Sequence, residues 1–169
     1  MKRTVATVVA LSLLPVLNVT AAHAADIVRQ PLGGGSTFPI ARAVEVPAGF
    51  KLIFHSGLTP SPANPKAKEG TPEYWGDTKT QTTAVFTRME ESLKQMGLGF
   101  GDVVKMNVFL VGEPATGKMD FKGFMEAYTQ HFGTKEQPNL PARSAVQVAS
   151  LAQPGMLVEI EVVLAKKTP

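Results

Sequence analysis

Arg143 is the residue of this chain with the clearest capacity for chemistry. It lies among small and apolar neighbours, directly before the strand-like run Ser144-Ala145-Val146-Gln147-Val148-Ala149. Removing a guanidinium group from water costs several kcal/mol unless an anion pairs with it. Its fork of N–H groups can hold a carboxylate through two parallel hydrogen bonds. Arg143 could therefore bind the carboxylate of a small 2-keto or 2-imino acid, or form an internal salt bridge to Glu159 or Glu161.

Glu159 is the second candidate. It lies in the expected strand 157–164, where strand alternation puts it on one face with Glu161. The turn Gln153-Pro154-Gly155 predicts a hairpin that could bring this face alongside Arg143. A carboxylate there could orient or deprotonate a water molecule that attacks an imine carbon. The alternative is an ion pair that is exposed or lies between subunits.

Ser56 and Gly57 are weaker candidates at the end of an expected strand, 51–55. Glycine allows a ligand to approach the backbone closely, and a hydroxyl group can hydrogen-bond to that ligand. The alternative is a plain strand end that leads into a loop. His55 and His131 are too far apart in the sequence to predict a metal site, and a chain without cysteine has no thiol chemistry.

The elements that must position these residues follow the order β-β-α-β-α-β-β. Strands are expected at 40–46, 51–55, 102–111, 144–149 and 157–164, with a long loop at 59–77. Helical spacing of apolar residues predicts one helix from Thr78 to Gly97 and a second from Asp120 to Gly133. This order predicts an α+β fold with one sheet and both helices on one face.

The other face of that sheet would be uncovered in a monomer. Apolar residues occur on both faces of the strand 51–55, where Leu52 and Phe54 alternate with Ile53. A neighbouring copy would bury the exposed apolar area. The pattern therefore predicts an oligomer.

The N-terminus has the form of a secretory leader. Lys2 and Arg3 precede an apolar run at 5–17, and Ala22-His23-Ala24 matches a signal-peptidase site. We expect a cleaved leader at 1–24, a flexible arm at 25–37 and one domain at 38–169. The predicted location is outside the cytoplasm, in the periplasm.

Charge argues against nucleic acid as a partner. Without the two leader charges, the 17 basic residues fall to 15, against 14 acidic ones. This near balance lacks the basic excess of a nucleic-acid-binding domain. No segment after the leader is apolar enough to cross a bilayer, so no membrane contact is expected after cleavage.

The C-terminal motif carries a family resemblance. Pro141-Ala142-Arg143-Ser144, an alternating valine strand, a Pro/Gly turn and Val158-Glu159-Ile160-Glu161-Val162 resemble the signature of the reactive-intermediate deaminase family, RidA/YjgF. The resemblance extends upstream to about Phe38. It implies a chorismate-mutase-like two-layer sandwich and a homotrimer with sites between subunits. It also implies hydrolysis of small 2-imino or enamine acids to 2-keto acids and ammonia, without a cofactor.

The resemblance also implies roles for individual residues. Arg143 falls on the family's substrate-binding arginine, and Glu159 on its acidic position. Ser56 and Gly57 would contact substrate. Ile40 and Met125 stand at substrate-binding positions where deaminating members commonly have tyrosine and asparagine, which leaves a more apolar pocket. A non-catalytic module that binds small carboxylates or metabolites on the same trimeric scaffold is the alternative function.

Overall fold

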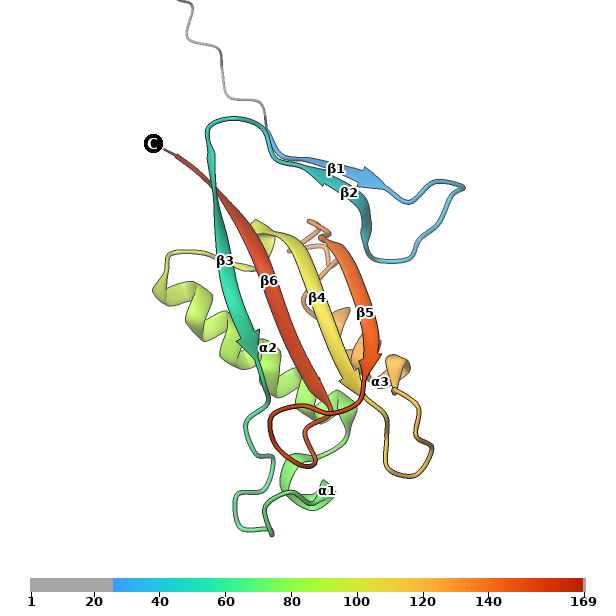
Figure 1. Cartoon of the computed structure of the whole chain (residues 1–169). Helices are drawn as coiled ribbons and strands as arrows, with labels where there is room; N and C mark the ends of the chain where they lie inside the picture. Colours follow the sequence, from blue (N-terminus) through green and yellow to red (C-terminus); the bar gives the residue numbers. More distant parts are fainter. Residues whose placement is uncertain (1–25, 169) are drawn as a thin grey trace, which may run out of the picture.

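The computed structural model describes residues 26–168, and the expected leader and residue 25 lie outside this range. A mixed sheet of six strands, in the order β1-β2-β5-β4-β6-β3, is covered on one face by α2 and α3 (Figure 1). The elements are β1 (Val28–Pro31), β2 (Ala41–Glu45), β3 (Phe50–Leu58), α1 (Pro72–Trp75), α2 (Thr78–Gln95), η1 (Phe100–Asp102), β4 (Val103–Val111), α3 (Phe121–Tyr128), β5 (Ala142–Val148) and β6 (Val158–Lys167). The predicted α+β fold with two helices on one face is confirmed.

The predicted hairpin of the last two strands is wrong. β4 lies between β5 and β6, parallel to β5 and antiparallel to β6. β5 therefore cannot hydrogen-bond to β6. The Val-rich β4 takes the central position because it is buried along one whole face, from Val104 through Met106 and Val108 to Leu110.

The segment expected to be a flexible arm contains a strand. β1 pairs antiparallel with β2, so Val28 lies opposite Glu45. Arg29 fixes this hairpin to the sheet, because its guanidinium donates to the carbonyls of Val103 at 2.9 Å, Leu140 at 2.7 Å and Gly101 at 2.9 Å. These contacts join residues far apart in the sequence, and local sequence pattern does not predict them.

The long loop at 59–77 packs against its own chain. Trp75 is buried and donates its indole N–H to the Pro154 carbonyl at 2.9 Å. Gln81 is fully buried and adds three hydrogen bonds close to Trp75. Its amide donates to the carbonyls of Gly76 and Gly155, both at 3.0 Å, and accepts from the Leu157 N–H at 2.7 Å. One side chain thus joins α2, the loop and the start of β6.

Gln81→Met is expected to lower the free energy of unfolding by about 3 kcal/mol, because a buried N–H and two carbonyls lose their partner. Denaturant unfolding measures this change. Thr83→Val is the control, since Thr83 is an exposed residue of the same helix whose hydroxyl donates to the Lys79 carbonyl. The control should change stability by less than about 0.5 kcal/mol. Equal effects of the two substitutions would contradict the role given to Gln81.

The sheet face opposite the helices is apolar and open. Phe54 is 78% exposed, Leu52 50% and Val146 47%. Strand register places these residues on the face away from α2 and α3, as the sequence pattern predicts. These side chains form an exposed apolar surface on the sheet, a feature that is common at interaction sites.

Candidate functional site

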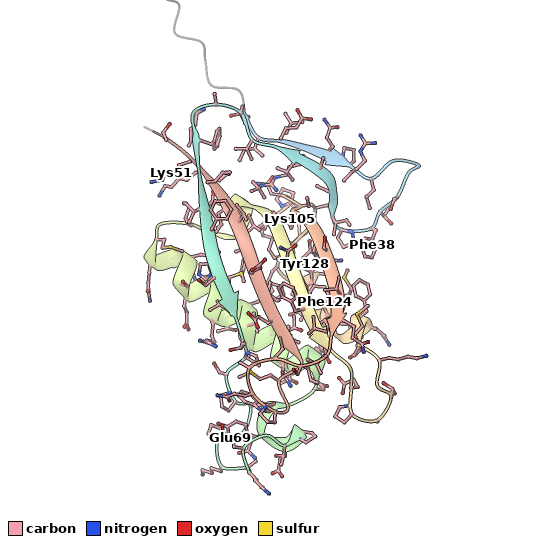
Figure 2. All side chains as sticks on the ribbon, in the orientation of Figure 1. Phe38, Lys51, Glu69, Lys105, Phe124 and Tyr128 are labelled. Carbon is pink, nitrogen blue, oxygen red and sulfur yellow. The ribbon has the colours of Figure 1, made fainter. Side chains whose placement is uncertain are left out.

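Arg143 lies on β5 and faces α3, inside an aromatic cage. Figure 2 labels three of the aromatic residues of this region, Phe38, Phe124 and Tyr128. The central carbon of the guanidinium lies 4.2 Å from the ring centre of Tyr128, 5.0 Å from Phe124, 5.5 Å from Phe38 and 5.8 Å from Phe121. Aromatic faces attract a cation, so the cage holds the guanidinium in place without neutralising it.

The guanidinium of Arg143 lacks an anionic partner among residues 26–168. Nη2 donates to the sulfur of Met125 at 3.2 Å, a weak acceptor, and the buried Nη1 makes no hydrogen bond to the chain. Burial lowers the pKa of Arg143, and the nearby Tyr128 opposes this shift. Arginine nevertheless stays protonated in proteins. A buried, charged donor is thus available to an anion.

The internal salt bridge that the sequence left open is not formed. The Glu161 carboxylate accepts from the Asn107 amide at 2.7 Å, on the open face of the sheet. Glu159 lies on that same face, packed against Gly57. Arg143 belongs to the opposite, helix-covered face, because it pairs with the buried Met106 of β4. Within one chain, the expected approach of Glu159 to Arg143 does not occur.

Tyr128 provides the ring that is nearest to the guanidinium. Its hydroxyl donates to the Pro39 carbonyl at 2.8 Å. Burial raises the pKa of Tyr128 to about 12, although nearby Arg143 favours the phenolate. The phenol is therefore neutral at physiological pH. It acts as an aromatic wall and not as the counter-ion of Arg143.

Gly57 and Glu159 form a second group, on the open face. The β3–β6 register shifts between His55 and Leu58, so Ser56 and Gly57 leave the regular ladder. A Cβ atom on Gly57 would meet the Glu159 carboxylate, so the Glu159 side chain would have to shift if Gly57 were replaced. A glycine backbone, a hydroxyl and a carboxylate thus lie in one small region.

His55 holds the backbone of this group. Its Nδ1 lies 2.8 Å from the Ser56 carbonyl, and Nε2 lies 2.9 Å from the Ser92 hydroxyl. A carbonyl only accepts, so Nδ1 carries a proton and donates to Ser56, while the Ser92 hydroxyl can pair with Nε2 as donor or acceptor. The ring therefore connects the strand end at Ser56 to α2.

Ile40 and Met125 both lie on the Arg143 side of the sheet. Met125 contacts the guanidinium through its sulfur. Ile40 lines a cavity of about 330 Å³ together with Phe38, one of the rings of the cage. The predicted site residues thus separate into two groups, with Arg143, Met125 and Ile40 in one and Ser56, Gly57 and Glu159 in the other.

The sequence analysis missed the aromatic cage. Phe121, Phe124 and Tyr128 recur at the spacing of a helix face, which is typical of core residues, and Phe124 and Tyr128 are buried. The rings of Phe124 and Tyr128 therefore both fill the core and face the guanidinium of Arg143. The one available signal was Arg143 itself, because a cation on the helix-facing side of a strand must contact the residues of the covering helix.

Two further findings bear on the kind of site. Among residues 26–168, no group of three His, Asp or Glu side chains is placed to hold a metal ion. No helix in that range combines the length and hydropathy that crossing a bilayer requires.

The chain is similar to known proteins over most of its length. A protein from Escherichia coli K12 named "Putative reactive intermediate deaminase TdcF" is 29% identical over 137 residues, which are 81% of this chain and 94% of that protein. Protein DfrA of Myxococcus xanthus is 33% identical over 74% of this chain and 83% of its own length. A RutC family protein of Pyrococcus abyssi is 34% identical over 92 residues, and the match spans 65% of its length.

Solved structures share the fold. A Rid family protein from Yersinia pestis gives a TM-score of 0.58 at 24% identity, over 82% of this chain and 98% of that one. The structure of E. coli TdcF with bound serine gives a TM-score of 0.54 at 29% identity, over 82% and 94%. The model of the family Endoribonuclease L-PSP matches residues 36–166, so the chain belongs to this family, that of the RidA and YjgF proteins which its C-terminal motif resembles.

Proposed function

We propose that the protein is a cofactor-independent deaminase that hydrolyses small 2-imino or enamine acids to 2-keto acids and ammonia. The observation that carries the proposal is the caged guanidinium of Arg143, whose buried Nη1 has no hydrogen-bond partner in residues 26–168. A buried donor of this kind favours a carboxylate ligand. The similarity to TdcF, whose structure was solved with bound serine, supports a small carboxylate as that ligand.

The site is proposed to lie between two copies of a homotrimer. Arg143 and Glu159 lie on opposite faces of the sheet, so one chain alone cannot present both to one small molecule. The exposed Phe54, Leu52 and Val146 give a second copy an apolar surface to cover. In this arrangement Arg143 of one copy is completed by Gly57 and Glu159 of its neighbour.

The reaction then needs few groups. Arg143 holds the substrate carboxylate, which places C2 of the protonated imine near Glu159 of the neighbouring copy. Glu159 accepts a proton from a water molecule as its oxygen adds to C2, and the proton passes to the nitrogen. The C–N bond breaks, ammonia leaves, and the hydroxyl proton is lost as the C2 carbonyl forms. Fixed positioning and a desolvated charge supply the rate gain.

Subunit complementation tests this arrangement. Arg143→Ala and Glu159→Gln chains, each carrying its own tag, are co-expressed, and trimers that contain both are purified. In a cyclic trimer every mixed assembly keeps one intact Arg143–Glu159 pair, so about one third of wild-type imine hydrolysis should return. Each parent trimer should have little activity. Mixed trimers no more active than their parents would contradict a site shared between copies.

We also propose that the protein is exported and loses residues 1–24, which lie outside the described range. The proposal rests on the charged start, apolar run and Ala22-His23-Ala24 motif. Intact mass of protein recovered from a periplasmic extract should correspond to a chain beginning at Ala25. A full-length chain confined to the cytoplasm would contradict export.

A further inference from the structure

A cavity of about 330 Å³ lies beneath the loop that joins β1 to β2. Its volume is at the lower end of the range for small-molecule sites, roughly 300 to 1,000 Å³. Its lining residues come from the β1–β2 hairpin and from the segment before β5: Arg29, Gln30, Pro31, Leu32, Ser36, Thr37, Phe38, Ile40, Ala41, Pro138, Asn139 and Leu140.

Two lining residues connect the cavity to the Arg143 site. Phe38 lines the cavity and also faces the guanidinium, whose central carbon lies 5.5 Å from the centre of its ring. Ile40 lines it as well, at a position where the family resemblance implies substrate contact. The cavity and the cation therefore share Phe38 as a wall.

Four of the five polar side chains that line the cavity already make hydrogen bonds, and the fifth is Thr37. The Arg29 guanidinium donates to three carbonyls, and the Gln30 amide donates to Glu45 at 2.9 Å. The Asn139 amide donates to the Gly101 carbonyl at 3.3 Å. The Ser36 hydroxyl accepts from the Phe38 N–H at 3.3 Å.

The remaining lining is mainly apolar, from Pro31, Leu32, Phe38, Ile40 and Leu140. An apolar ligand side chain that enters this cavity is removed from water, and the hydrogen bonds of the polar lining residues stay intact. A charged side chain would lose its hydration and gain little in return.

We infer that this cavity receives the side chain of the acid whose carboxylate binds Arg143. The substrate class is then 2-imino acids with branched aliphatic or aromatic side chains, in preference to short or charged ones. This inference rests on the proposed function and specifies its substrate. Each methylene that fills an apolar pocket contributes roughly 10- to 200-fold discrimination, so the preference should be measurable.

The experiment compares imines formed in situ from leucine and alanine by an amino-acid oxidase, with imine decay followed by semicarbazide trapping. Wild-type kcat/KM should favour the leucine-derived imine at least about 10-fold. Leu32→Asp places a charge in the cavity, so it should lower kcat/KM for the leucine-derived imine about 10-fold. The kcat/KM for the alanine-derived imine should change less than about twofold, because its short side chain does not reach the cavity. Val28→Asp is the matched control, since Val28 lies in the same hairpin, is 46% exposed and does not line the cavity.

Binding of 4-methyl-2-oxopentanoate and of pyruvate, measured by calorimetry, separates failure of this inference from failure of the proposed function. Equal kcat/KM values for the two imines, or an equal loss with both in Leu32→Asp, would overturn the assignment of the cavity and leave deamination standing. Tighter binding of the branched acid without any turnover would support the cavity and overturn deamination. Equal binding of the two acids without turnover would overturn both.

Discussion

Arg143→Ala is expected to lower kcat/KM for a 2-imino acid at least about 100-fold, which is about 2.7 kcal/mol of lost transition-state stabilisation. The substitution removes a charge-assisted hydrogen bond in a desolvated position, where such bonds are strongest. Imine decay on the purified protein gives the measurement. The fold should persist, because Arg143 forms no salt bridge within residues 26–168 that the substitution could break.

Two further variants define what Arg143 contributes. Arg143→Lys keeps the charge but loses the planar fork, so it should retain more activity than Arg143→Ala. Arg42→Ala removes an exposed arginine of β2 and should leave the rate unchanged. A kcat/KM for Arg143→Ala within twofold of wild type would contradict the proposed mechanism.

Phe54→Asp is expected to dissociate the proposed trimer and to remove most of the imine hydrolysis. Phe54 is 78% exposed in the single chain, and assembly through the open face would bury it. A carboxylate at this position would have to lose its hydration on assembly, which opposes burial of the open face. Light scattering during gel filtration should show the mass of a single chain. Activity should fall with the mass, because Arg143 and Glu159 would no longer meet.

Met96→Asp is the control for this experiment. Met96 is 41% exposed, but it caps the C-terminal end of α2, on the helix side of the sheet. The same charge there should leave both the mass and the rate unchanged. A Phe54→Asp protein with the wild-type mass would show that the open face is not the subunit interface.

Local signals predicted the helices and the helix-covered sheet. Asp120 accepts from the Gly123 N–H as the N-cap of α3, and the apolar spacing of α2 matches its buried residues. The N-cap of α2 is Asp77, one residue before the expected start at Thr78. Two features escaped prediction because they depend on contacts distant in the sequence. β4 enters between β5 and β6, and Arg29 fixes β1 to carbonyls that lie 72 to 111 residues away.

The sequence predicted only part of the site, because the rest depends on contacts between residues that are distant in the sequence. Arg143 was evident as a cation beside a core, and alternation correctly placed Glu159 and Glu161 on one face. Which face holds Arg143 depends on the pairing with β4, which the sequence does not specify. The aromatic cage was hidden because a helix stripe that surrounds a cation has the same spacing as one that fills a core.

A crystal structure of the trimer with a bound 2-keto acid tests the central claim most directly. The account predicts a carboxylate oxygen within hydrogen-bonding distance of Arg143 Nη1, about 2.7 to 2.9 Å, with Gly57 and Glu159 of a neighbouring copy facing C2. A ligand bound elsewhere would contradict the account. So would a guanidinium whose Nη1 is taken up by a side chain of the adjoining subunit.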